Sequence, residues 1–409
     1  MGTHKNPSEE FVHDICSKTF LSLWSYPNPQ GIRRGKELCD LLIVCDPDIV
    51  IFSVKDIPIK TQEPDEIARK RWNNKAIESS VKQIYGAERI LKTLKFVTKA
   101  DGTNGLQLPS PDSIRIHRIA IALGGKRKSY VRSGDFGKGH IHIFDDDSFR
   151  IILEELNTIS DFIDYLNAKT NLVSAARQTV LEGGEEDLLA FYLSNDRKFP
   201  QPTGFMIIGD NIWEDFYNSE PYKAKRKADE ISYVWDKLIE TVAGFALKDE
   251  LLFGPNISET EFALRFLARE TRLNRRSLGN ALIDFLSSTK HIDSRLMLGE
   301  SGIIYVFLAK LIGATRELRK TELEIRSFIA KDLFPKLPTV IGLATEIPND
   351  SGRSTWDLMC IHKEAWTEED HKSAILAKEK TGYFANQRIG KWEIDEYPST
   401  TQESGVSNE

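Results

Sequence analysis

Apolar residues near the start of the chain recur first at helical spacing and then in short continuous runs. Residues 8–25 carry apolar side chains three and four positions apart, which predicts an amphipathic helix with Ser8 as its N-cap. Two prolines and a glycine within residues 25–31 end that helix. The apolar runs 37–45 and 49–55 predict two strands, and the Asp-Pro-Asp turn between them predicts an antiparallel hairpin.

Helical and strand patterns continue to alternate up to about residue 170. The predicted elements are a helix at 74–94, strands at 115–123, 140–144 and about 149–153, and a helix near 158–168. This order of elements predicts one α/β domain over residues 1–170.

The rest of the chain divides into three parts by its pattern. Residues 171–255 predict a mostly helical middle region, with the clearest helix at 222–247. Residues 256–395 predict a C-terminal α+β domain, and the polar residues 396–409 predict a disordered tail. Within the C-terminal domain the pattern predicts a helix opened by the capping box Ser258-x-x-Glu261, strands near 302–309 and 338–345, and a helix at 314–331.

Composition and charge narrow the class of protein. Hydrophobic residues make up 40% and charged residues 28% of the chain, as in ordinary globular domains. No run of eighteen apolar residues occurs, so we expect neither a membrane-spanning helix nor a membrane partner. Four scattered cysteines and the lack of a secretory signal predict a reduced, cytoplasmic protein without structural zinc. Because the net charge is −6, any nucleic acid would be met by local basic patches.

Two charged residues lie in the predicted hairpin. Asp40 is surrounded by apolar residues in the first strand, and Lys55 ends the second. A charge among apolar neighbours needs a partner or a metal ion. Hydrolysis of a phosphodiester uses a divalent cation held by carboxylates and a positive group beside the attacking water. The hairpin therefore predicts an active centre built around Asp40 and Lys55, with an Asp40–Lys55 ion pair that needs no metal as the structural alternative.

The order of these residues resembles the PD-(D/E)XK superfamily of restriction-endonuclease-like nucleases. The matching segments are Ser-Glu-Glu at 8–10, Gly-Lys-Glu-Leu-Cys-Asp at 35–40, Phe-Ser-Val-Lys at 52–55 and Ser-Val-Lys-Gln-Ile-Tyr at 80–85. The resemblance covers about residues 8 to 170. It implies a restriction-endonuclease-like mixed sheet flanked by helices and an endonuclease that depends on Mg²⁺ or Mn²⁺. By the same resemblance, Asp40 ligates the metal, Lys55 polarises or positions the water, and Gln83 orients that water or a phosphate.

One position departs from the family pattern. The family has an acid two residues before its lysine, whereas this chain has Ser53, which we expect to be a small residue facing the cleft. A serine hydroxyl is a poor ligand for a hard cation. Four carboxylates are available to replace the missing acid: Glu9, Glu10, Glu37 and Asp56.

Spacing ranks these carboxylates. Glu9 shares a helical face with apolar residues three and seven positions on, so it is expected to point toward the sheet, with Glu10 more to the side. A dipolar role at the helix start is the alternative for both. Strand alternation puts Glu37 and Asp40 on opposite faces of the sheet unless a bulge intervenes. We therefore expect Glu9, followed by Glu10, to complete the metal site.

Basic residues gather at several places, and solvated surface charge is the alternative for each. Arg33, Arg34 and Lys36 precede the Asp40 strand and are the candidate nucleic-acid-binding residues. The other sets are Arg69, Lys70 and Arg71 beside Trp72; Lys126, Arg127, Lys128, Arg132 and Lys138; and Arg265, Arg269, Arg272 and Arg276. The last set forms a basic stripe if one helix continues that far, with a salt-bridged solvent face as its alternative. His140 and His142 are interpreted as hydrogen-bonded strand histidines.

The leading functional hypothesis is a metal-dependent endonuclease acting on DNA. By analogy with other chains that carry such a domain, it predicts a role in bacterial restriction or anti-phage defence, with a protein partner and with the oligomeric state left open. The second hypothesis is a catalytically silent, nuclease-like module that binds nucleic acid or scaffolds a complex. Ser53 is the residue that keeps the second hypothesis open.

Overall fold

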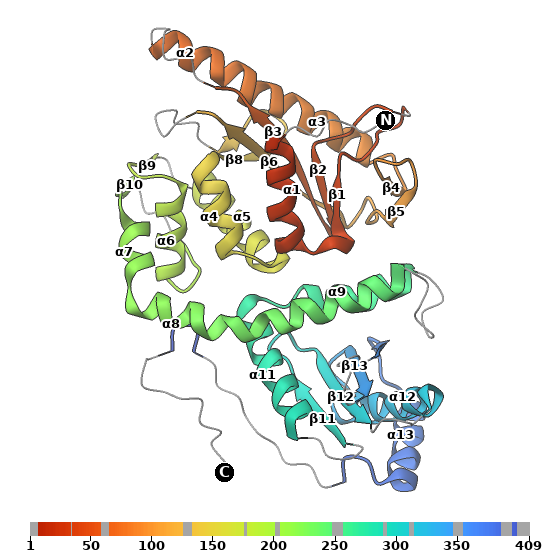
Figure 1. Cartoon of the computed structure of the whole chain (residues 1–409). Helices are drawn as coiled ribbons and strands as arrows, with labels where there is room; N and C mark the ends of the chain where they lie inside the picture. The colour runs from red at the N-terminus through yellow and green to blue at the C-terminus, as the bar shows by residue number, and fades with distance from the viewer. Residues whose placement is uncertain are drawn as a thin grey trace. The chain divides into compact units, whose positions relative to one another are not determined.

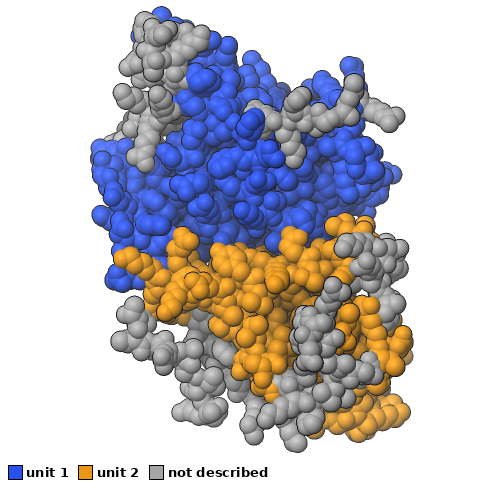
Figure 2. Space-filling view, viewed as in Figure 1, with its two compact units in different colours: residues 1–222 blue, residues 223–409 orange. Residues whose placement is uncertain are grey.

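The computed structural model divides into two compact units, Met1–Tyr222 and Lys223–Glu409 (Figure 2). The sequence predicted three folded parts, with boundaries near 170 and 255. The structure describes residues 7–33, 35–58, 65–125, 133–175, 178–200, 205–247, 257–288, 293–310, 315–346, 355–385 and 395–398. Most of the predicted tail lies outside these residues. None of the described helices is both long and apolar enough to cross a membrane.

The N-terminal unit is built on a six-stranded mixed sheet in the order β1-β2-β3-β6-β8-β7 (Figure 1). Its strands are β1 Ser25–Pro27, β2 Leu41–Cys45, β3 Asp48–Asp56, β6 Arg115–Leu123, β7 Gly134–Asp135 and β8 His140–Phe144. Strand β2 is antiparallel to β1 and β3, whereas β3, β6 and β8 run parallel. The predicted mixed sheet flanked by helices is thus confirmed. So is the predicted hairpin, in which Leu41 pairs with Phe52 and Cys45 pairs with Asp48.

Two helical layers cover opposite faces of this sheet. Phe52 and Ser53 are consecutive strand residues, so their side chains point to opposite faces. The Phe52 ring packs on Phe20 of α1 (Pro7–Phe20), with ring centroids 6.2 Å apart. The Ser53 hydroxyl contacts α3 (Ser79–Leu91) on the other face. Helix α3 continues from α2 (Asp65–Trp72) through the π-helical turn Asn73–Glu78 (Figure 1).

One predicted strand is a helix. Residues 149–153 lie in α4 (Asp146–Glu155), which begins after the N-cap Asp145, whose carboxylate accepts a hydrogen bond from the Ser148 N–H. Phe149, Ile152 and Leu153 are all buried. Their i, i+3, i+4 spacing suits one face of a helix, and the short apolar run had concealed this periodicity.

The N-terminal unit has seven further strands and α-helices before α8. They are β4 Phe96–Thr98, β5 Asn104–Gln107, α5 Ile159–Ala175, β9 Gln178–Leu181, α6 Glu185–Ser194, β10 Phe205–Ile208 and α7 Ile212–Asn218. Strands β4 and β5 pair antiparallel, and β9 and β10 pair parallel. Helix α8 (Glu220–Asp229) contains the boundary between the units.

The C-terminal unit has a four-stranded sheet in the order β11-β12-β13-β14. Its elements are α9 Tyr233–Leu247, α10 Ile257–Ala268, α11 Arg272–Ser288, β11 Asp293–Leu298, β12 Ile304–Lys310, α12 Arg316–Leu333, β13 Thr339–Glu346, β14 Trp356–His362 and α13 Glu368–Thr381. Strands β12 and β13 are parallel and are connected through α12. The two predicted strands and the helix between them match these elements, whereas β11 and β14 were not predicted.

The predicted basic stripe of the C-terminal unit is not a continuous helical face. Helix α10 ends at Ala268 and α11 begins at Arg272, so the spacing does not continue across the break. The Arg272 and Arg275 side chains are buried and pair with Asp236 of α9, at 2.9 and 2.5 Å. Arg265 pairs with Glu261, one turn before it. The expected capping box would have placed Glu261 in the first turn of the helix, but α10 already begins at Ile257. These arginines stabilise the unit and do not form an exposed stripe.

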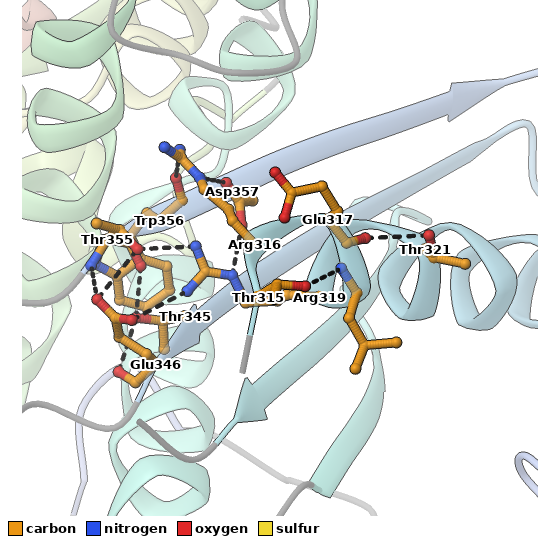
Figure 3. Close-up of polar contacts among 11 residues, drawn as sticks. Thr315, Arg316, Glu317, Arg319, Thr321, Thr345, Glu346, Thr355, Trp356 and Asp357 are labelled. Carbon is orange, nitrogen blue, oxygen red and sulfur yellow. Dashed lines mark hydrogen bonds and ion pairs between the residues drawn. The ribbon is translucent and has the colours of Figure 1, made fainter. Parts of the chain in front are cut away.

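A second group of ion pairs around a buried aspartate lies at the start of α12 (Figure 3). Asp357 of β14 is buried and accepts hydrogen bonds from Arg316 at 2.8 Å and from Arg319 at 2.5 Å. Arg319 also donates to the Thr355 hydroxyl at 2.8 Å. The helix is capped by Thr315, whose hydroxyl accepts from the Leu318 N–H. The charged groups at this edge of the sheet are therefore paired within the unit.

We expect Asp236→Ala to lower the free energy of unfolding of the C-terminal unit by about 3–5 kcal/mol, because it leaves two buried guanidinium groups without their carboxylate. Urea unfolding followed by tryptophan fluorescence, to which the neighbouring buried Trp235 contributes, measures the change. The matched control is Asp284→Ala, which removes the more exposed partner of Arg295 and should cost about 0–1 kcal/mol. Equal losses in the two variants would contradict the structural role assigned to Asp236.

Candidate functional site

The hairpin brings Asp40 and Lys55 together. Asp40 comes immediately before β2, and Lys55 is the penultimate residue of β3. Because the two strands are antiparallel, the start of β2 lies at the same edge as the end of β3. The Lys55 Nζ atom lies 3.5 Å from Asp40 Oδ2. Asp40 is only 7% exposed, whereas the side chain of Lys55 is 28% exposed, so the pair is reached by solvent from the lysine side.

The Asp40 carboxylate is held by three donors. The Val54 N–H donates to Oδ2 at 2.5 Å, which ties the residue before β2 to the backbone of β3. Gln83 Nε2 of α3 donates to Oδ1 at 3.0 Å, and Lys55 approaches Oδ2. These donors satisfy the hydrogen-bonding capacity of a carboxylate that is buried. The structure thus places Asp40, Lys55 and Gln83, three of the predicted site residues, in one hydrogen-bonded group.

Ser53 positions Gln83. Its hydroxyl donates to Gln83 Oε1 at 2.9 Å and lies 3.0 Å from the Ser80 hydroxyl. Ser53 is 0% exposed, so the expectation that it faces an open cleft is wrong. Ser80 and Gln83 are one turn apart on α3 and both point at the sheet because of that spacing. A chain of hydrogen bonds therefore runs from Ser53 through Gln83 to Asp40.

Glu37 contacts Asp40, contrary to the sequence-based expectation. Although Glu37 as a whole residue is exposed, its carboxyl group is half-buried and hydrogen-bonded to the Asp40 carboxyl group. Its pKa is raised from 4.5 to about 7, first by burial and then by the charge and hydrogen bond of Asp40. The strand was predicted to start at residue 37, but β2 begins at Leu41, so strand alternation does not apply to Glu37. Glu37 instead forms an isolated bridge with Gln30.

The first turn of α1 lies beside the same edge of the sheet. The Ser8 hydroxyl donates to Asp56 Oδ2 at 2.5 Å; the helix already includes Pro7, so Ser8 is not its N-cap. Glu9 is partly buried, and its negative charge contributes to the raised pKa of Glu37. Glu10 is exposed. Of the two glutamates predicted to complete the site, Glu9 is therefore the one whose charge affects the pKa of Glu37.

The donor set fits a magnesium-type ion but is not a complete cage. Among the described residues, no three His, Cys, Asp or Glu side chains form a group that could hold a metal ion. Mg²⁺ does not need one, because it usually takes one or two carboxylates and keeps water and substrate phosphates as its other ligands. Glu37 and Asp40, with their carboxyl groups in contact, provide two such oxygen ligands. Displacement of the proton that Glu37 holds would be part of binding.

The predicted nucleic-acid-binding residues lie beside this group. Arg33 and Lys36 are exposed in a turn closed by the hydrogen bond from the Gly31 N–H to the Lys36 carbonyl, at 2.7 Å. Lys36 immediately precedes Glu37. Arg34 lies outside the described residues. So do Lys126, Arg127, Lys128 and Arg132 of the basic set that also includes Lys138.

His140 and His142 of β8 are not the fully hydrogen-bonded pair that the sequence suggested. His140 Nε2 and His142 Nδ1 are buried without a hydrogen-bond partner in the described part of the chain. Burial and the charge of Lys169 lower the pKa of His140 to about 4 and hold that of His142 well below 6.5. Both rings are therefore neutral near pH 7. They lie two strands away from β3 and do not contact Asp40.

Comparisons with protein-family models, with curated proteins and with solved structures found no match for this chain. The function is therefore inferred from the residues around Asp40 and from their order in the sequence. The residue that the sequence placed on the other face of the sheet, Glu37, interacts with Asp40. Its spacing of three from Asp40 would have suggested a shared site only if residues 37–40 had been recognised as lying before the strand.

We expect Ser53→Ala to lower the free energy of unfolding by about 1–3 kcal/mol, because it removes a buried hydroxyl that bonds to Gln83 and lies beside Ser80. Urea denaturation followed by circular dichroism measures the loss. Ser79→Ala on the same helix is the matched control, since that exposed hydroxyl makes only a 3.3 Å contact with a backbone carbonyl. A larger loss for Ser79→Ala would refute the positioning role of Ser53.

Proposed function

We propose that the N-terminal unit is a metal-dependent endonuclease that hydrolyses phosphodiester bonds in DNA. The observation that carries the proposal is the meeting of Asp40, Lys55 and Gln83, from two strands and a helix, in one hydrogen-bonded group. These are the three residues to which the resemblance to PD-(D/E)XK nucleases assigned the chemistry. Their order in the sequence and their contacts in the fold support the same function.

Each residue has a role in this proposal. Glu37 and Asp40 hold the divalent cation, with Glu9 as the next carboxylate. The cation, when bound, supplies Lewis-acid stabilisation of the phosphoryl oxygens. Lys55 is partly exposed, so its ammonium group is able to meet the attacking water or the negative charge that develops on the phosphate. The amide of Gln83, which Ser53 holds in place, orients the water or a phosphate oxygen.

The structure also supplies an argument for the silent-module alternative. The Asp40 carboxylate already accepts from Val54 and Gln83 and pairs with Lys55, so it is stable without a metal ion. The acid that the family pattern requires is replaced by a buried serine. An active enzyme must therefore recruit Glu37, and the two functions differ in whether Glu37 contributes to cation binding.

Plasmid DNA incubated with the purified chain and Mg²⁺ should be nicked or linearised, and chelator should stop the reaction. We expect Asp40→Asn and Lys55→Ala each to slow cutting by roughly 10²- to 10⁴-fold, because they remove a cation ligand and the charge beside the water. Lys18→Ala, which alters an exposed residue in the last turn of α1, is the control and should cut at the normal rate. If the wild type binds DNA but never cuts it, the silent module is the correct function.

Cation binding gives a readout that does not depend on activity. We expect Glu37→Gln to weaken Mn²⁺ or Mg²⁺ binding by roughly 10- to 100-fold in isothermal titration calorimetry, because one of two carboxylate ligands is lost. Glu154→Gln, an exposed glutamate of α4, should bind the ion as the wild type does. Unchanged affinity in Glu37→Gln would remove Glu37 from the site, and a larger loss in Glu9→Gln would restore the original ranking of the carboxylates.

A further inference from the structure

Lysine side chains cluster on the outer face of the long helix formed by α2 and α3. Lys70, Arg71, Lys75 and Lys82 are all exposed. Between positions 70 and 82 the one acidic residue is Glu78. This is a strong local excess of positive charge in a chain whose net charge is −6. We call Lys70, Lys75 and Lys82 the helix lysines.

The helix lysines have no ion-pair partner among the described residues, whereas some other cations of the same unit do. Within the part of the chain that the structure describes, no carboxylate lies within ion-pair distance of any of them. By contrast, Lys92 at the end of α3 pairs with Glu88 at 2.8 Å, and Arg118 pairs with the same glutamate at 2.7 Å. Like charges held close together on one surface repel each other unless an anion binds between them.

The opposite face of the helix holds these lysines in place. Trp72 is buried, and its indole N–H donates to the Leu123 carbonyl of β6 at 3.3 Å. Ala76 and Ile77 are buried within the π-helical turn. Because this inner face is packed on the sheet, the backbone that carries the helix lysines is held in place, and little backbone entropy is lost when a ligand binds.

One of the helix lysines is adjacent in sequence to a residue of the candidate active site. Lys82 is adjacent in sequence to Gln83, whose side chain donates to Asp40. At a rise of 1.5 Å per residue, Lys70 and Lys82 are about 18 Å apart along the helix, somewhat less through the π-helical turn. One strand of a DNA duplex carries roughly five phosphates in that length. Figure 1 shows α2 and α3 as one continuous rod along the N-terminal unit.

We propose that the helix lysines bind the phosphates of a nucleic-acid backbone and so deliver a phosphodiester to the Asp40 site. The choice of ligand rests on the proposed function. A row of exposed ammonium groups recognises phosphate charge and carries no base information. The helix lysines therefore contribute sequence-independent affinity that depends steeply on salt, in addition to the contacts expected from Arg33 and Lys36.

The test uses the full chain in the presence of chelator, so that no cutting occurs. It measures binding to a fluorescein-labelled DNA duplex of about 30 base pairs at several salt concentrations between about 50 and 200 mM. We expect the triple variant Lys70→Gln/Lys75→Gln/Lys82→Gln to bind roughly 10- to 100-fold more weakly. The slope of log affinity against log salt should become shallower by about 0.9 for each lysine that contacted a phosphate. Circular dichroism establishes that the variant remains folded.

The matched control removes three lysines from α13, in the variant Lys372→Gln/Lys378→Gln/Lys380→Gln, which changes the net charge by the same amount. It should bind with the wild-type affinity and salt slope. If both triple variants weaken binding equally, the effect is one of net charge, and the proposed surface is wrong.

Failure of this inference and failure of the proposed function give different results. If the wild type cuts DNA with Mg²⁺ but the helix-lysine variant binds as tightly as before, the surface is refuted and the nuclease stands. If the wild type does not cut but the variant loses binding, the surface stands and the chain is a binding module. If the wild type does not bind the duplex in chelator, the inference is overturned whatever the cutting assay shows.

Discussion

The hydrogen bond from the Val54 N–H to the Asp40 carboxylate is the constraint on which the candidate site depends. It joins the residue before β2 to the end of β3, at the open end of the hairpin, opposite the turn. With the carboxylate fixed in this way, Lys55 approaches it from β3, and Gln83 approaches it from α3. An isolated buried carboxylate would be costly, so this arrangement of donors is what allows Asp40 to remain in the core.

Two carboxyl groups lie together in the candidate site, and the second comes from the segment before β2. The position that would carry an acid in the resembling family is Ser53, which the structure uses to hold Gln83. A second carboxyl group arrives from Glu37, in the segment before β2, and contacts Asp40 directly. The resulting pair has the oxygen chemistry that Mg²⁺ prefers, and the charge of Asp40 contributes to the raised pKa of Glu37.

Charged residues have two different roles in the chain. In the C-terminal unit, Arg275 and Arg319 are buried and bound to aspartates, so they contribute to stability and to the choice of one packing arrangement. In the N-terminal unit, Lys169 is likewise buried and paired with Glu185, whereas Lys75 and Lys82 are exposed and have no ion-pair partner among the described residues. The buried pairs have a structural role, and the exposed lysines are the ones proposed to bind phosphate.

Local pattern determined much of the fold. The predicted strands at 115–123 and 140–144 match β6 and β8, because isoleucines alternate with other residues in both segments, a pattern that favours strands. The hairpin, and with it the approach of Asp40 to Lys55, also followed from a short turn between two apolar runs. Residues 149–153 were predicted wrongly because so short an apolar run suits a strand and one face of a helix equally.

The amino-acid sequence by itself determined that an acid and a lysine would meet at one edge of a hairpin, since pairing and turn formation are local. Only the tertiary structure decided that Glu37 completes the pair, that Ser53 is buried, and that Arg272 is not exposed. Those outcomes depend on where β2 begins and where α10 ends, and on which distant helix covers each side chain. Long-range packing sets which charged groups lose their water, and periodicity along the chain does not contain that information.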